Sequence, residues 1–432
     1  MGRLIYIAIF LGALVLAFMA GRFLAPAPTF QLGALDRNDP LTQAFEEFIQ
    51  AQRQTIDLFH KSQFYEDDQE RAEAYRGFLY SLVGSIKAGA LQSADQPRFM
   101  RAVDWTSKSG LDNPDNNYYI AMVHDDADYR ITGKRGSTAD LVFQLVVGQP
   151  GVRGAGTSTN VSILHGRELQ LDATGGFEIL ISRDDPGPDQ NWLPNGEGAQ
   201  TLLVRYTHSD WNTERDAPLR IEKLGAEGEN AIPLTPYRMA QGMREAAVSL
   251  FDRNATWLQY AERAWTMMPR NGISAPRVTE GGLVGQYSAF GSWELDNDQA
   301  IILSIPASDA LYQGVELGNL WFVSLDYETR TSSLTLDQMH CSQDGRCVAV
   351  ISHRDPGIQN WLDTEGHRRG LIMMRWQGLA QPLPESLHPQ AQLVSFDDRF
   401  DALPADVPRF SAEERKQQIR QRRAAVQERF GG

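Results

Sequence analysis

The first apolar residues with helical spacing lie in the segment from residue 36 to residue 95. Asp39-Pro40 has the residue types of a helix N-cap and first turn. Apolar side chains then recur every three or four residues in two series, at Leu41, Phe45, Phe48, Ile49, Ile56 and Phe59, and at Ala72, Tyr75, Leu79, Leu82, Val83 and Ile86. We therefore predict a helical hairpin over residues 36–95, with both stripes as packing faces.

The pattern changes at Asn117, where short apolar runs separated by Gly, Asp and Asn replace the helical spacing. Such runs indicate β-strands, and they fill two regions, residues 103–228 and 280–398. Between them, residues 233–269 return to helical spacing and predict connecting helices. The basic stretch of residues 410–430 begins with a capping box and predicts a solvated C-terminal helix, with anionic lipid or acidic protein as an alternative contact.

An internal repeat relates the two strand-rich regions. Gly175 lies shortly before FEILISRDDPGPDQNWL and LLVRY, and Gly345 lies shortly before CVAVISHRDPGIQNWL and LIMMRW. The offset is 345 − 175 = 170 residues, and it recurs where Arg205 matches Arg375. Two segments of such similar sequence indicate two copies of one domain.

The repeat and the strand pattern together predict the fold class. Upstream, Leu141-Val142-Phe143 matches Leu320-Trp321-Phe322. We predict a mainly β protein with α additions, built from two tandem β-sandwich or jelly-roll domains that the central helices separate. An N-terminal transmembrane helix and the helical hairpin precede these domains.

The N-terminal run from Leu4 to Gly21 contains no charged residue and is flanked by Arg3 and Arg22. Its length is at the short end of what spans a bilayer. A cleaved signal peptide is the alternative, because Ala25-Pro26-Ala27 has the small residues of a cleavage site, although Pro28 then follows directly. We predict an uncleaved membrane anchor over residues 1–24.

Three blocks of the chain carry a resemblance to a known family. They are DNPDNNYYIAMVHDDADYRITGKRG, GNLWFVSLDYETRTSSL and DGRCVAVISHRDPGIQNWLDTEGHRRGLIMMRW. From about Asp104 to Trp376 the chain resembles the bacterial family called domain of unknown function 1214. The resemblance implies β-rich, jelly-roll-like sheets, and it implies no activity and no site residues.

Composition excludes several classes of protein. The chain has 432 residues, of which 42% are hydrophobic, enough for well-formed cores and too many for a disordered chain. A mean hydropathy of −0.38 excludes a multi-span membrane protein. With 41 basic and 55 acidic residues, the net charge is −14, so no nucleic-acid partner is expected.

The two cysteines bear on the cellular compartment. Cys341 and Cys347 flank the turn residues Asp344-Gly345, so we predict a disulfide across a hairpin, with two unpaired thiols as the alternative. Zinc is not expected, because only His340 is adjacent. A disulfide is stable in an oxidising compartment. With the anchor, it predicts a single-pass protein of the bacterial inner membrane whose bulk is periplasmic.

The repeated DPG…QNWL loops are candidate ligand sites at the ends of the sheets. In this interpretation Trp192 and Trp361 stack on a sugar or an apolar ring, and Arg205 and Arg375 donate to a carboxylate or phosphate. The predicted ligand-binding residues are Asn191, Trp192, Arg205, Asn360, Trp361 and Arg375. The alternative is a purely structural role, in which these residues cap turns and close the ends of the sandwiches.

The second copy also carries candidate catalytic residues, His353, Asp355, Asp363 and His367. They could serve as acid and base, although exposed loop histidines are the alternative and no spacing predicts a metal or cofactor. We predict a binding or envelope-interaction module for an envelope glycan, lipid or small molecule. The alternative is an enzyme of hydrolase or lyase type that acts on such a compound through the second repeat, and a third interpretation is a structural spacer.

Overall fold

The structure, a computed structural model, describes residues 39–152, 159–278, 283 and 285–431. The predicted anchor, residues 1–24, lies outside these ranges. Within them, no helix is both long and apolar enough to cross a membrane.

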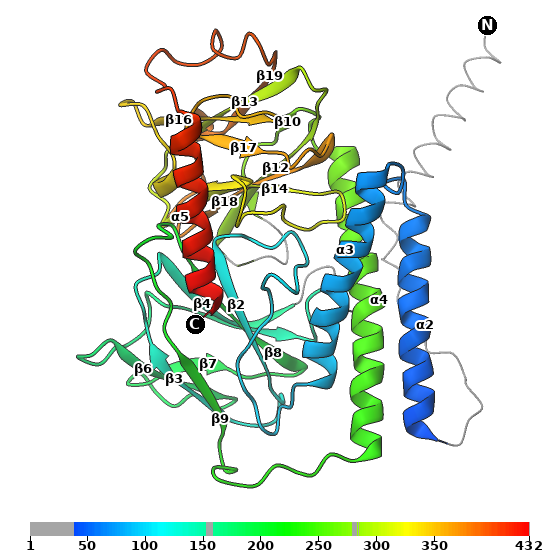
Figure 1. The fold of residues 1–432 in the computed structure, drawn as a ribbon. Helices are drawn as coiled ribbons and strands as arrows, with labels where there is room; N and C mark the ends of the chain where they lie inside the picture. Colours follow the sequence, from blue (N-terminus) through cyan, green and yellow to red (C-terminus); the bar gives the residue numbers. More distant parts are fainter. Residues whose placement is uncertain (1–38, 153–158, 279–282, 284, 432) are drawn as a thin grey trace, which may run out of the picture.

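The helices are α2 (Pro40–His60), α3 (Asp68–Ser85) with its π-helical extension η1 (Ile86–Ala90), α4 (Pro236–Met267) and α5 (Ala412–Gly431). Asp39 caps α2 by accepting from the backbone of the first turn, as predicted, and Thr235 caps α4. Both α2 and α3 pack along α4, which runs between them (Figure 1). The segment expected to be a hairpin therefore forms a three-helix layer with α4.

The packing face predicted for α3 is wrong. Tyr75 and Leu79 are 44% and 57% exposed, whereas Glu70, Glu73 and Gly77 are buried. The buried side of α3 carries Glu70 and Glu73, which lie beside His367, and Gly77, which lies beside Trp321. Helical spacing of apolar residues shows which side of a helix is apolar, and part of that side of α3 is exposed to solvent. Phe45 of α2 is likewise 52% exposed.

The first repeat contains a five-stranded sheet of order β1-β2-β8-β4-β5 and a four-stranded sheet of order β7-β6-β3-β9. One apolar core, with residues from both sheets, lies between them. The strands are β1 (Met100–Arg101), β2 (Asn116–Met122), β3 (Tyr129–Lys134), β4 (Asp140–Val147), β5 (Asn160–His165), β6 (Gly176–Ser182), β7 (Asn191–Pro194), β8 (Ala199–Thr207) and β9 (Leu219–Lys223).

The second repeat has the same arrangement, with sheets of order β10-β12-β18-β14-β15 and β17-β16-β13-β19 around a second core, and β11 paired to β12. The strands are β10 (Gly272–Ile273), β11 (Arg277–Val278), β12 (Gln286–Glu294), β13 (Gln299–Pro306), β14 (Tyr312–Gly318), β15 (Ser333–Thr335), β16 (Arg346–Ser352), β17 (Trp361–Asp363), β18 (Arg369–Gln377) and β19 (Gln390–Ser395). The predicted class, mainly β with helical additions, is confirmed.

Strand register shows which positions correspond between the repeats. Arg205 lies opposite Val142 of β4, and Arg375 lies opposite Gly314 of β14. Because β4 corresponds to β14, Leu141 corresponds to Gln313. The predicted match of Leu141-Val142-Phe143 with residues 320–322 is therefore wrong, since the latter follow β14 in a turn. Alignment by residue type alone matched the apolar run of residues 320–322 in place of the residues of β14.

The predicted disulfide between Cys341 and Cys347 is confirmed. The two residues face each other as an antiparallel bridge, and Gly345 turns the chain between them with a φ of 80°. Among the described residues, no group of three or more His, Cys, Asp or Glu side chains is placed to hold a metal ion.

The C-terminal helix α5 differs from the solvated helix that was predicted. It lies against both repeats (Figure 1). Arg415, Arg422 and Arg429, spaced seven residues apart on one side, are only 7%, 5% and 4% exposed. The basic residues of this side are therefore held by the protein itself.

Candidate ligand-binding cavity between the repeats

A cavity of about 270 Å³ lies where the larger sheets of the two repeats meet α4. Along β8, Leu202, Val204 and Tyr206 point into the sandwich core, so the alternate residues Leu203 and Arg205 point out of it, into the cavity. The same alternation on β18 places Met373 and Arg375 in the cavity. The walls are mainly apolar, with contributions from Ile120, Met122, Leu203, Trp257, Phe290 and Met373.

The structure brings together Arg205 and Arg375, two of the six predicted ligand residues. Arg375 donates to the carboxylate of Glu316 and, over 2.6 Å, to the backbone oxygen of Leu111. Arg205 donates instead to the amide oxygen of Gln144. The ring centroid of Tyr118 lies 5.8 Å from the Arg205 guanidinium.

Burial and neighbouring charge act differently on these groups. Burial lowers the pKa of Arg205, which has no carboxylate to oppose that effect. Burial also acts to lower the pKa of Arg375, but the Glu316 carboxylate together with Tyr118 and Tyr312 outweighs it, so the pKa of Arg375 is raised. Burial raises the pKa of the Tyr118 phenol, which is therefore neutral at pH 7.

A third guanidinium, that of Arg253, was missed by the sequence reasoning. It lines the cavity from α4, donates to Gln149 Oε1 over 3.4 Å, and its Nε has no hydrogen-bond partner among the described residues. Burial lowers the pKa of Arg253 to about 10. The signal that could have identified it is its position between Leu250 and Trp257, on the apolar side of a helix, where an arginine is unusual.

The predicted asparagine and tryptophan residues lie apart from the cavity and have the same structural role in both repeats. The Asn191 amide donates to Gln170 O and Glu178 O over 3.0 and 2.8 Å. Trp192 Nε1 donates to Ser182 O over 3.1 Å. In the second repeat Asn360 bonds His340 O and Val348 O, and Trp361 bonds Ser352 O. These contacts favour the structural interpretation of the DPG…QNWL loops.

The candidate catalytic residues are each held by another part of the fold, and none lines the cavity between the repeats. The partners of His353 are Thr364 Oγ1 at 2.6 Å and Leu295 O at 3.1 Å. Asp355 pairs with Arg415 of α5 at 3.0 Å, and Asp363 pairs with Arg330 at 2.8 Å. No carboxylate–histidine pair that faces an open site results.

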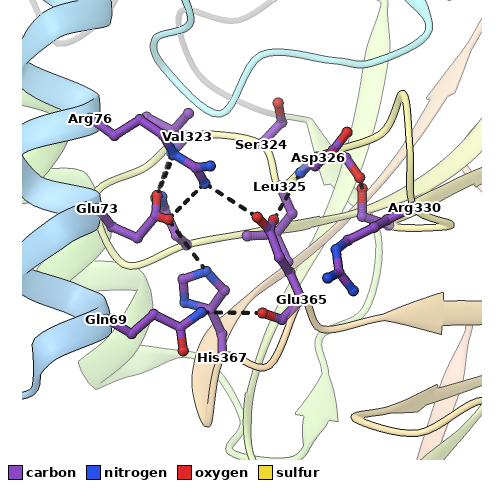
Figure 2. Close-up of polar contacts among 12 residues, drawn as sticks. Gln69, Glu73, Arg76, Val323, Ser324, Leu325, Asp326, Arg330, Glu365 and His367 are labelled. Atoms are coloured by element: carbon purple, nitrogen blue, oxygen red, sulfur yellow. Dashed lines mark hydrogen bonds and ion pairs between the residues drawn. The ribbon is translucent and has the colours of Figure 1, made fainter. Parts of the chain in front are cut away.

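His367 is fully buried in the charged network that attaches α3 to the second repeat (Figure 2). Its Nδ1 lies 3.2 Å from Glu70 Oε1, and its Nε2 lies 3.9 Å from Glu73 Oε1. Arg76 bridges Glu73 and Glu365 at 2.7 and 3.6 Å. Burial lowers the pKa of His367, but the hydrogen bond and charge of Glu70 outweigh it, so the pKa is raised.

We expect His367 to make stability depend on pH, since its pKa is higher in the folded protein than in the unfolded chain. The three carboxylates that face it, Glu70, Glu73 and Glu365, favour imidazolium. Its contribution is full below the unfolded pKa of about 6.5 and is lost as pH rises through the folded value. His367→Asn should therefore cost about 1.5–3 kcal/mol at pH 6 and less at pH 8.5. Urea unfolding at both pH values measures this; an equal cost at the two would contradict it.

Among solved structures, an uncharacterised protein from Burkholderia cenocepacia matches with a TM-score of 0.76 and 28% sequence identity, over 82% of this chain and 97% of that one. The VPA0106 protein from Vibrio parahaemolyticus matches with a TM-score of 0.42 and 12% identity, over 74% and 98% of the respective chains. No family model matches this chain, and no curated protein does. The chain is thus similar in fold to the Burkholderia protein over nearly all of that protein's length.

Proposed function

We propose that this protein is a binding module that holds a small, largely apolar molecule in the cavity between its two repeats. The observation that carries the proposal is the composition of the cavity wall, in which apolar side chains from both repeats and α4 surround a few convergent polar groups. Ligand sites in proteins have this composition, and they are often found at domain interfaces. A volume of about 270 Å³ suits a ligand smaller than most drugs.

The proposal extends to architecture and location. We infer that the repeats are tandem sandwich domains of one duplicated unit, because the order of their main strands corresponds. The sequence blocks support a relationship to the domain of unknown function 1214. We also infer that residues 1–24 anchor the chain in the inner membrane with its bulk in the periplasm. The Cys341–Cys347 disulfide supports an oxidising location.

An enzymatic function is not favoured by the contacts. The candidate acids and bases are paired with other side chains or backbone, and the cavity lining includes none of them. Arginine and tyrosine are the main titratable groups on the walls beside Lys87 and Asp112, a set that suits binding and orientation better than proton transfer at neutral pH.

The test is calorimetric titration of the full chain in a maltoside detergent with octan-1-ol, a neutral probe with an apolar body. We expect binding to the native protein and at least a tenfold loss of affinity in Leu203→Trp, because the larger side chain occupies the cavity. The matched control is Leu79→Trp, since Leu79 is exposed on α3. Equal binding by Leu203→Trp and the native protein would place the ligand elsewhere and refute the proposal.

A further inference from the structure

We propose that the ligand is an amphipathic carboxylic acid whose carboxylate binds Arg205, while Arg375 remains committed to the protein. This inference rests on the proposed function, because it needs the cavity to be a binding site. It goes further by assigning the ligand's charge and by distinguishing between two arginines that the repeat makes equivalent.

The two repeats differ in the group that accepts a hydrogen bond from the equivalent arginine. Arg205 and Arg375 occupy equivalent positions on β8 and β18, opposite Val142 and Gly314. Two residues further along β4 and β14, the equivalent acceptors are Gln144 and Glu316, and each is hydrogen-bonded to its own arginine. The second repeat therefore neutralises its guanidinium internally, whereas the first offers Arg205 only a neutral amide.

The charged side chains around the cavity differ in whether an opposite charge lies beside them. Lys87 is paired with Asp104 at 2.6 Å, so its charge is compensated. The carboxylate of Asp112 accepts from Ser324 Oγ over 2.9 Å and lies beside the charge of Lys108. Among the described residues, neither Arg205 nor Arg253 has a carboxylate within ion-pair distance, and both line the cavity. An uncompensated guanidinium group in a mainly apolar cavity is costly unless an anion pairs with it, and the position of Arg205 beside the neutral Gln144 amide leaves room for such a partner.

The chemistry of the walls determines the kind of anion. A guanidinium binds carboxylates and phosphates alike through paired N–H donors. Lys87 and Arg375 are already paired with carboxylates, so Arg205 offers one uncompensated positive charge, which favours a singly charged group over a doubly charged one. The apolar remainder of the wall requires an apolar body. A singly charged carboxylate on a short hydrocarbon chain or ring satisfies all three conditions.

The experiment compares octanoate, octan-1-ol and octyl phosphate as probes of the full chain by calorimetry. We expect octanoate to bind the native protein at least tenfold more tightly than octan-1-ol. Gln144→Glu supplies Arg205 with the carboxylate that Arg375 already has, and it should weaken octanoate binding about 10- to 100-fold with octan-1-ol binding unchanged. The matched variant Glu316→Gln reproduces the first repeat's arrangement in the second, and it should bind octanoate at least as tightly as the native protein.

Arg205→Gln provides a second measurement should Gln144→Glu fail to fold, and it should lose octanoate affinity at least tenfold. Unchanged octanoate affinity in Gln144→Glu or in Arg205→Gln would overturn the assignment of the anion site, and tighter binding of octyl phosphate would overturn the choice of carboxylate. If octan-1-ol binds and octanoate binds no better, only this inference fails. If neither binds, the proposed function fails as well.

Discussion

Replacing Arg375 with methionine is expected to destabilise the protein by about 3–5 kcal/mol at pH 7, the largest effect we anticipate for a single side chain. The equivalent change in the first repeat, Arg205→Met, should cost only about 1 kcal/mol or less. The two arginines lie at corresponding positions of corresponding strands, so the difference isolates what each contacts.

The reason is the carboxylate that Arg375 would leave behind. Glu316 is 2% exposed, burial raises its pKa, and Arg375 is the largest influence that opposes this rise. Without the guanidinium, Glu316 must take up a proton to remain buried. From a reference value of 4.5 this costs about 1.4 kcal/mol per pH unit, or about 3 kcal/mol at pH 7. Removal of Arg205 leaves only an amide oxygen, that of Gln144, without its donor.

Urea unfolding of both variants measures the difference, and its pH dependence identifies the cause. In Arg375→Met the pKa of Glu316 rises above its already raised native value, so the cost should grow as pH rises through that native value. The double variant Glu316→Gln/Arg375→Met should be more stable than Arg375→Met alone. Equal costs for Arg375→Met and Arg205→Met, or a cost that does not vary with pH, would contradict a buried ion pair.

Part of this architecture could be predicted from the sequence because it depends on local patterns. Short apolar runs separated by Gly, Asp and Asn predicted the strand regions, and the repeated motif aligned Arg205 with Arg375 correctly. A turn signal, Asp344-Gly345, was enough to pair the two cysteines. For the strands and the disulfide, the deciding information lay within a few residues of the feature itself.

The parts that could not be predicted depend on contacts between distant segments. The buried carboxylates of α3, Glu70 and Glu73, appeared as a solvated side because their partner His367 is almost three hundred residues away. Arg253 lines the cavity because α4 packs against both repeats, which its sequence position does not show. Trp192 and Trp361 were plausible ligand platforms until their indole N–H groups were seen to bond the preceding strands. The charge and size of a side chain show whether it is buried only when the group that it contacts is known.

The burial of the basic side of helix α5 also depends on contacts with distant segments. One of its arginines, Arg422, is the basis of the second prediction with a large expected effect. Arg422 Nε donates to Tyr327 O and Arg330 O over 3.2 and 3.1 Å, and its Nη2 donates to Ser333 Oγ over 2.9 Å, all in the second repeat. Its guanidinium also lies 4.5 Å from the ring centroid of Trp211, which follows β8 of the first repeat. One side chain thus links the C-terminal helix to both halves of the protein.

Arg422→Ala should therefore destabilise the protein by about 3–4 kcal/mol, because backbone carbonyl groups lose their donors in a buried site and the Trp211 ring loses its cover. Arg420 is the matched control: it lies on the same helix, its side chain is 59% exposed, and its partners among the described residues are Glu413 and Gln417 of α5. Arg420→Ala should change stability by no more than about 0.5 kcal/mol. Urea unfolding measures both changes, and limited trypsin digestion should release α5 fragments from Arg422→Ala first. If the two variants unfold at the same urea concentration, α5 does not hold the repeats together, since removal of a buried, hydrogen-bonded arginine would then be no different from removal of a solvated one.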